Sequence, residues 1–163
     1  MENLYLKHRC YHFESIGRII YDPVRNGVTE PWSAIVEIDK DLGDYYRLLF
    51  NNHFKVNIQK PNWKPHISLF RGISEYTPEM EKFWKEMDGK EINFVYTKDV
   101  FWNQNFVWIN TYFPEFFSLR EKMGLAHTHE DNETWGHITI GKFRHPGQLG
   151  DFTDFTRKNP KNY

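Results

Sequence analysis

Two short stretches of this sequence share one pattern of residue types. HISL occupies residues 66–69, near the middle of the chain, and HITI occupies residues 137–140, near its end. Alternate residues of a β-strand point to the same face, so each stretch would place an imidazole beside a hydroxyl and an isoleucine on the opposite face. Both stretches alternate as strands do. We therefore expect two strands that each present one histidine and one hydroxyl.

These residue types suit the cleavage of a phosphodiester. If the two strands lie side by side about a pseudo-twofold axis, their four polar side chains converge on one face: His66, Ser68, His137 and Thr139. An imidazole titrates near neutral pH, so one histidine can accept a proton while the other donates one. The hydroxyls can donate hydrogen bonds to phosphate oxygens as negative charge builds. We predict these four residues to be catalytic without a metal or other cofactor; which histidine is the base stays open.

The two motifs share more than the histidine and the hydroxyl. Each has isoleucine between them, an aliphatic residue after the hydroxyl, and a basic residue five positions after the histidine, Arg71 or Lys142. We expect both cations to bind the anionic ligand. In a regular strand, however, a side chain five positions on points to the opposite face, so a bend at Gly72 or Gly141 would have to return it.

At these motifs the sequence resembles the two-histidine (2H) phosphoesterase superfamily, whose signature is two His-x-Thr/Ser motifs on central strands. The resemblance covers most of residues 1–143, and Ser68 replaces the commoner threonine of the first motif. It implies an α+β, bilobal fold in which two pseudo-symmetric antiparallel sheets flank a central cleft, with helices outside. It also implies metal-independent cleavage of phosphodiesters at a ribose.

Within that superfamily the chain looks most like the phage anti-CBASS phosphodiesterases, which degrade cyclic di- and trinucleotide signals of bacterial antiviral systems. The compact length, the stretch NLYLKHRCYHFESIGRIIYDP at residues 3–23 and the polar C-terminal stretch carry this likeness. It implies a cyclic-nucleotide partner and a place in the host bacterial cytoplasm. It further implies that Tyr11 stacks on a nucleobase and that residues 144–163 close over the ligand.

The composition of the chain limits the kinds of partner that it is expected to bind. The net charge of −1 and the pI near 6.7 argue against a long nucleic acid as partner. Cys10 is the only cysteine, which fits a reducing compartment. No apolar run reaches the roughly 20 residues of a membrane span, so we expect a cytoplasmic protein without a membrane partner. Aromatic residues make up 18% of the chain, and we expect them to pack the core, Trp63, Trp102, Trp108 and Trp135 included.

Hydrophobic spacing and turn residues predict one bilobal domain over residues 1–143, followed by a polar tail at 144–163 that we hypothesise to be a lid. About three strands fall in each half, with one motif in each. Strands are expected at 3–8, 16–21, 32–38, 66–71, 92–97, 106–112 and 135–143, helices at 39–54, 77–89 and 114–124, and a loop at 21–31.

Three alternatives remain open at this point. His127, His129, Glu130 and Asp131 could hold a metal, although their spacing matches no standard zinc signature. The enzyme could instead act on the 2',3'-cyclic end of an RNA fragment. Finally, the chain could be a non-catalytic sponge for cyclic nucleotides, although a sponge has no need for two imidazole–hydroxyl pairs. The oligomeric state is not predicted.

Overall fold

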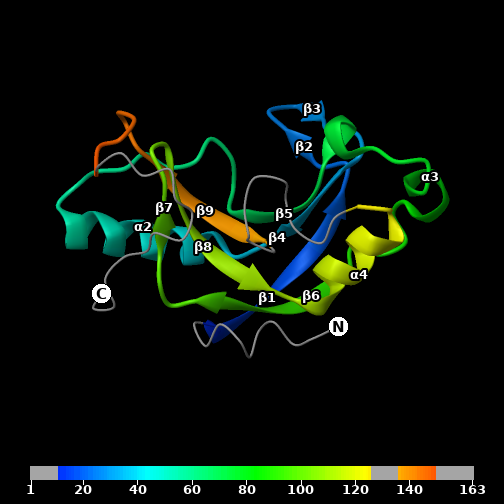
Figure 1. The fold of residues 1–163 in the computed structure, drawn as a ribbon, viewed down its shortest axis with the longest axis horizontal. Coiled ribbons are helices and arrows are strands. Elements are labelled where there is room, and N and C mark those ends of the chain that lie inside the picture. The colour runs from blue at the N-terminus through cyan, green and yellow to red at the C-terminus, as the bar shows by residue number, and fades with distance from the viewer. Residues whose placement is uncertain (1–10, 126–135, 150–163) are drawn as a thin grey trace.

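A computed structural model describes residues 11–125 and 136–149, and Figure 1 shows its arrangement. The elements, in chain order, are β1 Tyr11–Tyr21, β2 Val24–Arg25, β3 Val28–Thr29, β4 Ser33–Glu37, α2 Lys40–Phe54, β5 His66–Arg71, a 3₁₀ helix at Gly72–Glu75, α3 Met80–Phe83, β6 Glu91–Thr97, β7 Phe101–Trp102, β8 Phe106–Tyr112, α4 Pro114–Lys122 and β9 His137–Lys142. Among the described residues, no helix is long and apolar enough to cross a membrane.

Six strands close into one antiparallel barrel. The strand order is β6-β1-β4-β5-β9-β8-β7, and β6 also pairs with β8, which closes the ring. The expected mixture of helices and strands is confirmed. The finer expectation, two antiparallel sheets that flank a cleft, is matched only loosely: β1 pairs with β6 and β5 pairs with β9, so hydrogen-bonded strand pairs join the two halves at both junctions.

The barrel contains an internal repeat. In the first half the order is β1, β4, α2, β5, and in the second half it is β6, β8, α4, β9, with the same antiparallel neighbours in each. Each helix crosses to the other half: α2 packs against β9, and α4 packs against β5. Figure 1 shows these helices at opposite sides of the molecule, with β5 and β9 side by side between them. The two halves are therefore related by a pseudo-twofold axis near β5 and β9.

Each strand of the barrel has one face in the core. In β1, Gly17 and Ile19 are buried, whereas Glu14, Ile16 and Arg18 are exposed. The same alternation runs through β6, and the buried side chains of all six strands join the helix aromatics in one core cluster. The sheet therefore has a core face, which the helices cover, and an opposite face with many polar side chains.

Tertiary contacts shorten the helix expected at 77–89. The helix spans only Met80–Phe83, because Trp84 is extended and Lys85 has a φ of 68°. The Trp84 indole donates to both carboxylate oxygens of Asp22 at 3.1 Å, a contact that a continuing helix would break. Packing between distant segments thus overrides helix propensity here.

The expected loop at 21–31 contains a short hairpin. Val24 pairs with Thr29 and Arg25 with Val28, and the turn residues Asn26 and Gly27 have φ angles of 52° and 77°. Two successive positive φ angles match the type I′ turn that Asn-Gly favours. The strand expected at 3–8 lies outside the described residues.

Candidate functional site

The two motif strands lie side by side at their centres. Ile67 of β5 pairs with Ile138 of β9 in antiparallel register, and both side chains are 0% exposed. The isoleucines anchor the core face, as the sequence predicted. The expected juxtaposition of the two strands about a pseudo-twofold axis is confirmed.

That register brings all four motif side chains to the opposite face of the sheet. Because the strands are antiparallel about Ile67 and Ile138, His66 lies opposite Thr139, and Ser68 lies opposite His137. Directly opposite residues have Cβ atoms about 4.5–5.5 Å apart, and diagonal neighbours, here the two histidines, about 7–8 Å apart. All four side chains are half-buried. We call this surface the motif face.

A backbone carbonyl fixes the tautomer of His66. Its Nδ1 lies 2.8 Å from the carbonyl oxygen of Lys64. Since a carbonyl only accepts hydrogen bonds, Nδ1 must carry the proton, and Nε2 of the neutral ring is then an acceptor. The ring of Trp63 lies 4.8 Å from the imidazole, centroid to centroid. His66 is thus held with a basic nitrogen directed away from the backbone.

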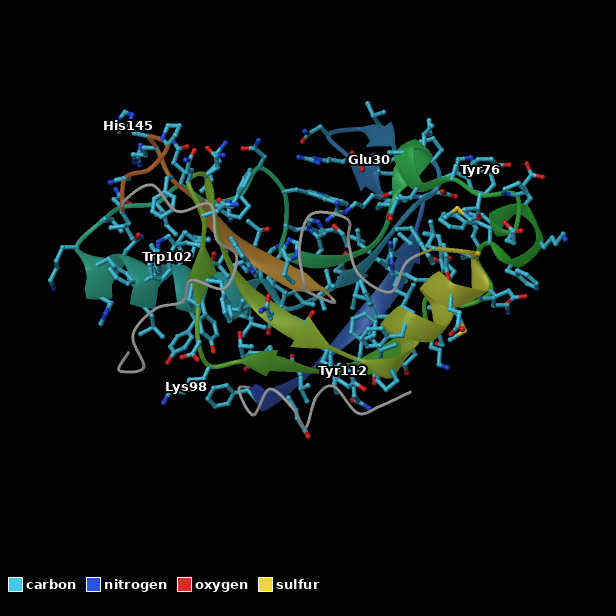
Figure 2. The ribbon with its side chains drawn as sticks, in the orientation of Figure 1. Glu30, Tyr76, Lys98, Trp102, Tyr112 and His145 are labelled. Atoms are coloured by element: carbon cyan, nitrogen blue, oxygen red, sulfur yellow. The ribbon has the colours of Figure 1, made fainter. Side chains whose placement is uncertain are left out.

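Burial lowers the pKa of His66 below its ordinary value of 6.5, and the Lys64 carbonyl opposes this by stabilising the protonated ring. The β2–β3 hairpin supplies two further charges: Arg25 lowers the pKa and Glu30 raises it. Figure 2 shows Glu30 beside this hairpin. The net effect is a histidine that is neutral at pH 7.

His137 has different neighbours. Its ring lies 6.1 Å from that of Trp108, and its partner across the β8–β9 ladder is Asn110, whose Oδ1 accepts from the Trp108 indole at 3.1 Å. The corresponding partner of His66 is Glu37, which forms an ion pair with Lys64. The two halves thus match in the motif residues and differ in what surrounds them.

A β-bulge follows the hydroxyl residue of the first motif. Across the β4–β5 ladder, Ile35 pairs with Ser68 and Ala34 pairs with Phe70, so Leu69 has no opposite residue. A bulge reverses the alternation of side chains that follow it.

The second motif has the same bulge at the same place. Across the β8–β9 ladder, Trp108 pairs with Thr139 and Val107 pairs with Gly141, which leaves Ile140 without an opposite residue. Leu69 and Ile140 are each the third residue after the motif histidine. The repeat therefore extends to this irregularity of the backbone.

The bulges correct the expectation for Arg71 and Lys142. A regular strand would turn them to the core face, but the extra residue returns both to the motif face. In β9 the irregularity includes Gly141, as expected, whereas in β5 it falls before Gly72. Arg71 is exposed, and the Lys142 ammonium donates to Asn62 Oδ1 at 2.9 Å. Both cations therefore share the face of the motif side chains, and their binding to a ligand stays a prediction.

Two further arginines approach the motif strands and were not predicted. Arg120 of α4 donates to the Leu69 carbonyl at 2.8 Å, and Arg47 of α2 donates to the Ile140 carbonyl at 3.2 Å. Arg120 is 1% exposed. Each is at helical spacing from a buried aromatic residue of its own helix, Arg47 three residues before Phe50 and Arg120 four residues after Phe116. A cation on the apolar side of a helix was the signal in the sequence that could have identified them.

The other predicted positions are only partly described. Tyr11 pairs through its backbone with Thr97, which lies next to Asn110, the partner of His137. Measured along the sheet, Tyr11 is thus three strand spacings, about 14 Å, from the backbone of His137. The side chain of Tyr11 lies outside the described residues, as do Cys10, Trp135 and most of the tail. Trp102 belongs to the core cluster, as expected. Trp108 is buried beside His137 instead of in that cluster, and Trp63 is half-buried beside His66.

The alternative metal site at residues 127–131 also lies outside the described part of the chain. Within the described residues, no group of three or more histidine, cysteine, aspartate or glutamate side chains is placed to hold a metal ion. No protein-family model, curated protein or solved structure matches the chain. The function of the protein is therefore inferred from the geometry of the motif face.

Proposed function

We propose that this protein is a phosphodiesterase that cleaves 3'-5' linkages of cyclic di- and trinucleotides, with His66 and His137 as the acid–base pair and without a metal ion. The observation that carries the proposal is the Ile67–Ile138 register, which sets each histidine opposite the hydroxyl of the other motif. Two proton-transfer groups and two hydroxyl donors thereby share one face of the sheet, at spacings from which they can contact one phosphate.

His66 is the base of the first step. Its Nε2 is unprotonated in the tautomer that the Lys64 carbonyl selects, and burial keeps the ring neutral. His66 takes the proton from the ribose 2'-hydroxyl, whose oxygen forms a bond to phosphorus. His137 gives a proton to the 5'-oxygen as the bond from phosphorus to that oxygen breaks. The product is a linear nucleotide with a 2',3'-cyclic phosphate end.

Water then opens this cyclic end with the histidine roles exchanged, which gives a 3'-phosphate. Ser68 and Thr139 donate to the non-bridging oxygens. Arg71 and Lys142 are on the same face and neutralise the phosphates of the ligand. The near-neutral charge of the chain favours a small anion over a long RNA. In this account the enzyme acts in a host bacterial cytoplasm.

A panel of substrates tests the proposal. The protein is incubated with cyclic dinucleotides, cyclic trinucleotides and 2',3'-cyclic mononucleotides, and the products are resolved by mass. Linear products from the cyclic oligonucleotides support the proposal. Opening of the 2',3'-cyclic ends alone points to RNA ends as the substrate, and tight binding without any product points to a sponge.

Chelation is expected to leave turnover unchanged. Saturating EDTA should change kcat by less than about twofold, because the histidines and hydroxyls supply the protons and charge stabilisation that a metal would otherwise supply. Initial rates with and without EDTA check this. Loss of activity that zinc or manganese restores would move the reactive centre to His127 and His129.

The acidic limb of the pH profile should lie below pH 6.5. The pKa of His66 is lowered in the folded enzyme, so the base stays unprotonated as the pH falls through 6.5 and loses activity only near its own lower pKa. The dependence of kcat/KM on pH reports the free enzyme and measures this limb directly. A limb centred above 6.5 would assign the base to another group.

A further inference from the structure

The two unpredicted arginines occupy equivalent positions in the internal repeat. Arg47 belongs to α2 of the first half and reaches β9 of the second, whereas Arg120 belongs to α4 of the second half and reaches β5 of the first. Each donates through Nη1 to the carbonyl of the bulged residue, Ile140 or Leu69. The pseudo-twofold axis that relates the motifs thus also relates these two contacts.

Each guanidinium is fixed by a carboxylate. Arg47 pairs with Asp44, one turn earlier in α2. Arg120 pairs with Glu75 through two bonds, of 2.6 Å and 3.1 Å. Glu75 Oε1 also accepts from the backbone nitrogen of Arg71 at 2.9 Å. A bidentate pair of this kind holds its donor in one orientation.

The carbonyls that accept from the two arginines belong to Leu69 and Ile140, the bulged residues of the motif strands. A bulge interrupts the hydrogen-bond ladder, and a carbonyl in such a position needs a donor from elsewhere when it is buried. Ser68 and Thr139 immediately precede the bulges, and Arg71 and Lys142 reach the motif face only because of them. The bulge conformation therefore sets both the hydroxyls and the cations of each half.

We infer that Arg47 and Arg120 are positioning residues, each of which holds the motif strand of the opposite half in the bulged conformation that the reaction requires. The direct ladder between β5 and β9 consists of the Ile67–Ile138 pair, so the crossed arginine bonds also fix the two motifs relative to each other. The expected effect on kcat rests on the proposed function. The expected effect on the conformation of the motif strands does not depend on it.

Arg47→Met tests the inference, because Met keeps an unbranched apolar side chain but has no donor. The Arg47 side chain is 17% exposed, so this variant is better tolerated than the same change at the fully buried Arg120. We expect kcat on a cyclic dinucleotide to fall about 10²-fold, since misplacement by about 1 Å costs that much. The Kd for an uncleavable 2'-deoxy analogue should stay within about twofold.

Two variants serve as controls. Arg47→Lys retains a donor and should recover part of the lost kcat, whereas a role confined to stability would not appear as a change in kcat at constant Kd. Lys122→Met removes another helix cation, one that pairs with Glu86 and lies over the Phe83 ring, and should leave kcat unchanged. Wild-type kcat in folded Arg47→Met, or an equal loss in Lys122→Met, would overturn the inference.

Amide hydrogen exchange separates this inference from the proposed function. In Arg47→Met the amides of β9 should exchange about tenfold faster, while those of β5, held by Arg120, should not change. If the wild type cleaves nothing, the proposed function fails, and this exchange difference still tests the positioning role. Unchanged protection of β9 would refute that role whether or not the protein is an enzyme.

Discussion

His66→Ala and His137→Ala are each expected to lower kcat on a cyclic dinucleotide by about 10²- to 10⁴-fold, the usual contribution of a general acid or base. Each removes one of the two proton transfers and leaves the core face, anchored by Ile67 and Ile138, intact. The double variant should be little slower than the worse single variant, because groups that act together are not additive.

The matching hydroxyl variants are expected to lose less. Ser68→Ala and Thr139→Ala each remove one hydrogen bond to the phosphate but no proton transfer. His53→Ala provides the control, since it removes an exposed histidine in the last turn of α2 that belongs to neither motif. Thermal unfolding shows whether each variant remains folded. A folded His66→Ala or His137→Ala enzyme with wild-type kcat would refute the paired-histidine mechanism.

A cyclic dinucleotide without the 2'-hydroxyl beside its scissile phosphate should bind but resist cleavage by at least about 10³-fold. Both motifs supply proton-transfer groups, and the two hydroxyls are assigned to hydrogen bonding, so the nucleophile comes from the substrate. A neighbouring hydroxyl attacks with an effective molarity that reaches about 10⁵–10⁸ M in well-oriented cases, an advantage that water lacks.

Calorimetric Kd values and single-turnover rates for the ribose and deoxy ligands measure this difference. The matched control is a ligand that lacks only a 2'-hydroxyl remote from the scissile phosphate, which should be cleaved normally. If the deoxy analogue were cleaved at a rate close to that of the ribose form, water would be the attacking group, and His66 would activate water instead.

The motif strands could be predicted from the sequence because their information is local. Alternation placed Ile67 and Ile138 in the core and the histidines on the other face, as the structure has them. The helix expected at 39–54 is found at Lys40–Phe54, where Asp39 caps its first turn through a hydrogen bond to Asp41. Helix caps and hydrophobic spacing involve residues that are close in sequence, so they can be recognised without knowing which distant segments pack against them.

The closure of the barrel and the two bulges could not be predicted in the same way. Pairing of β6 with β8, and the register shifts at Leu69 and Ile140, depend on segments that are distant in sequence. Alternation alone put Arg71 and Lys142 on the core face, and one extra residue in each strand reverses that result. The arginine contacts depend on the helices crossing between the halves, which hydrophobic spacing does not specify.

The helix expected at 77–89 is an element that local signals predict but that the structure shortens. Its local signals favour a helix, but Trp84 and Asp22 form a contact between segments far apart in the chain, and the helix ends at Phe83. Local propensity is a weak effect that such packing readily exceeds. Elements whose signals are local were therefore predicted correctly. Elements whose bounds or register depend on contacts with distant segments of the chain were not.

Metal-independent cleavage by the two histidines is tested most directly by mass analysis, over time, of one 3'-5' linked cyclic ribodinucleotide incubated with the protein in EDTA. We expect a linear product with a 2',3'-cyclic phosphate end that forms first, followed by its 3'-phosphate, and no such product with the His66→Ala and His137→Ala variants. A 5'-phosphate product, or intact ligand after prolonged incubation with a stoichiometric amount of folded protein across the di- and trinucleotide panel, would contradict it.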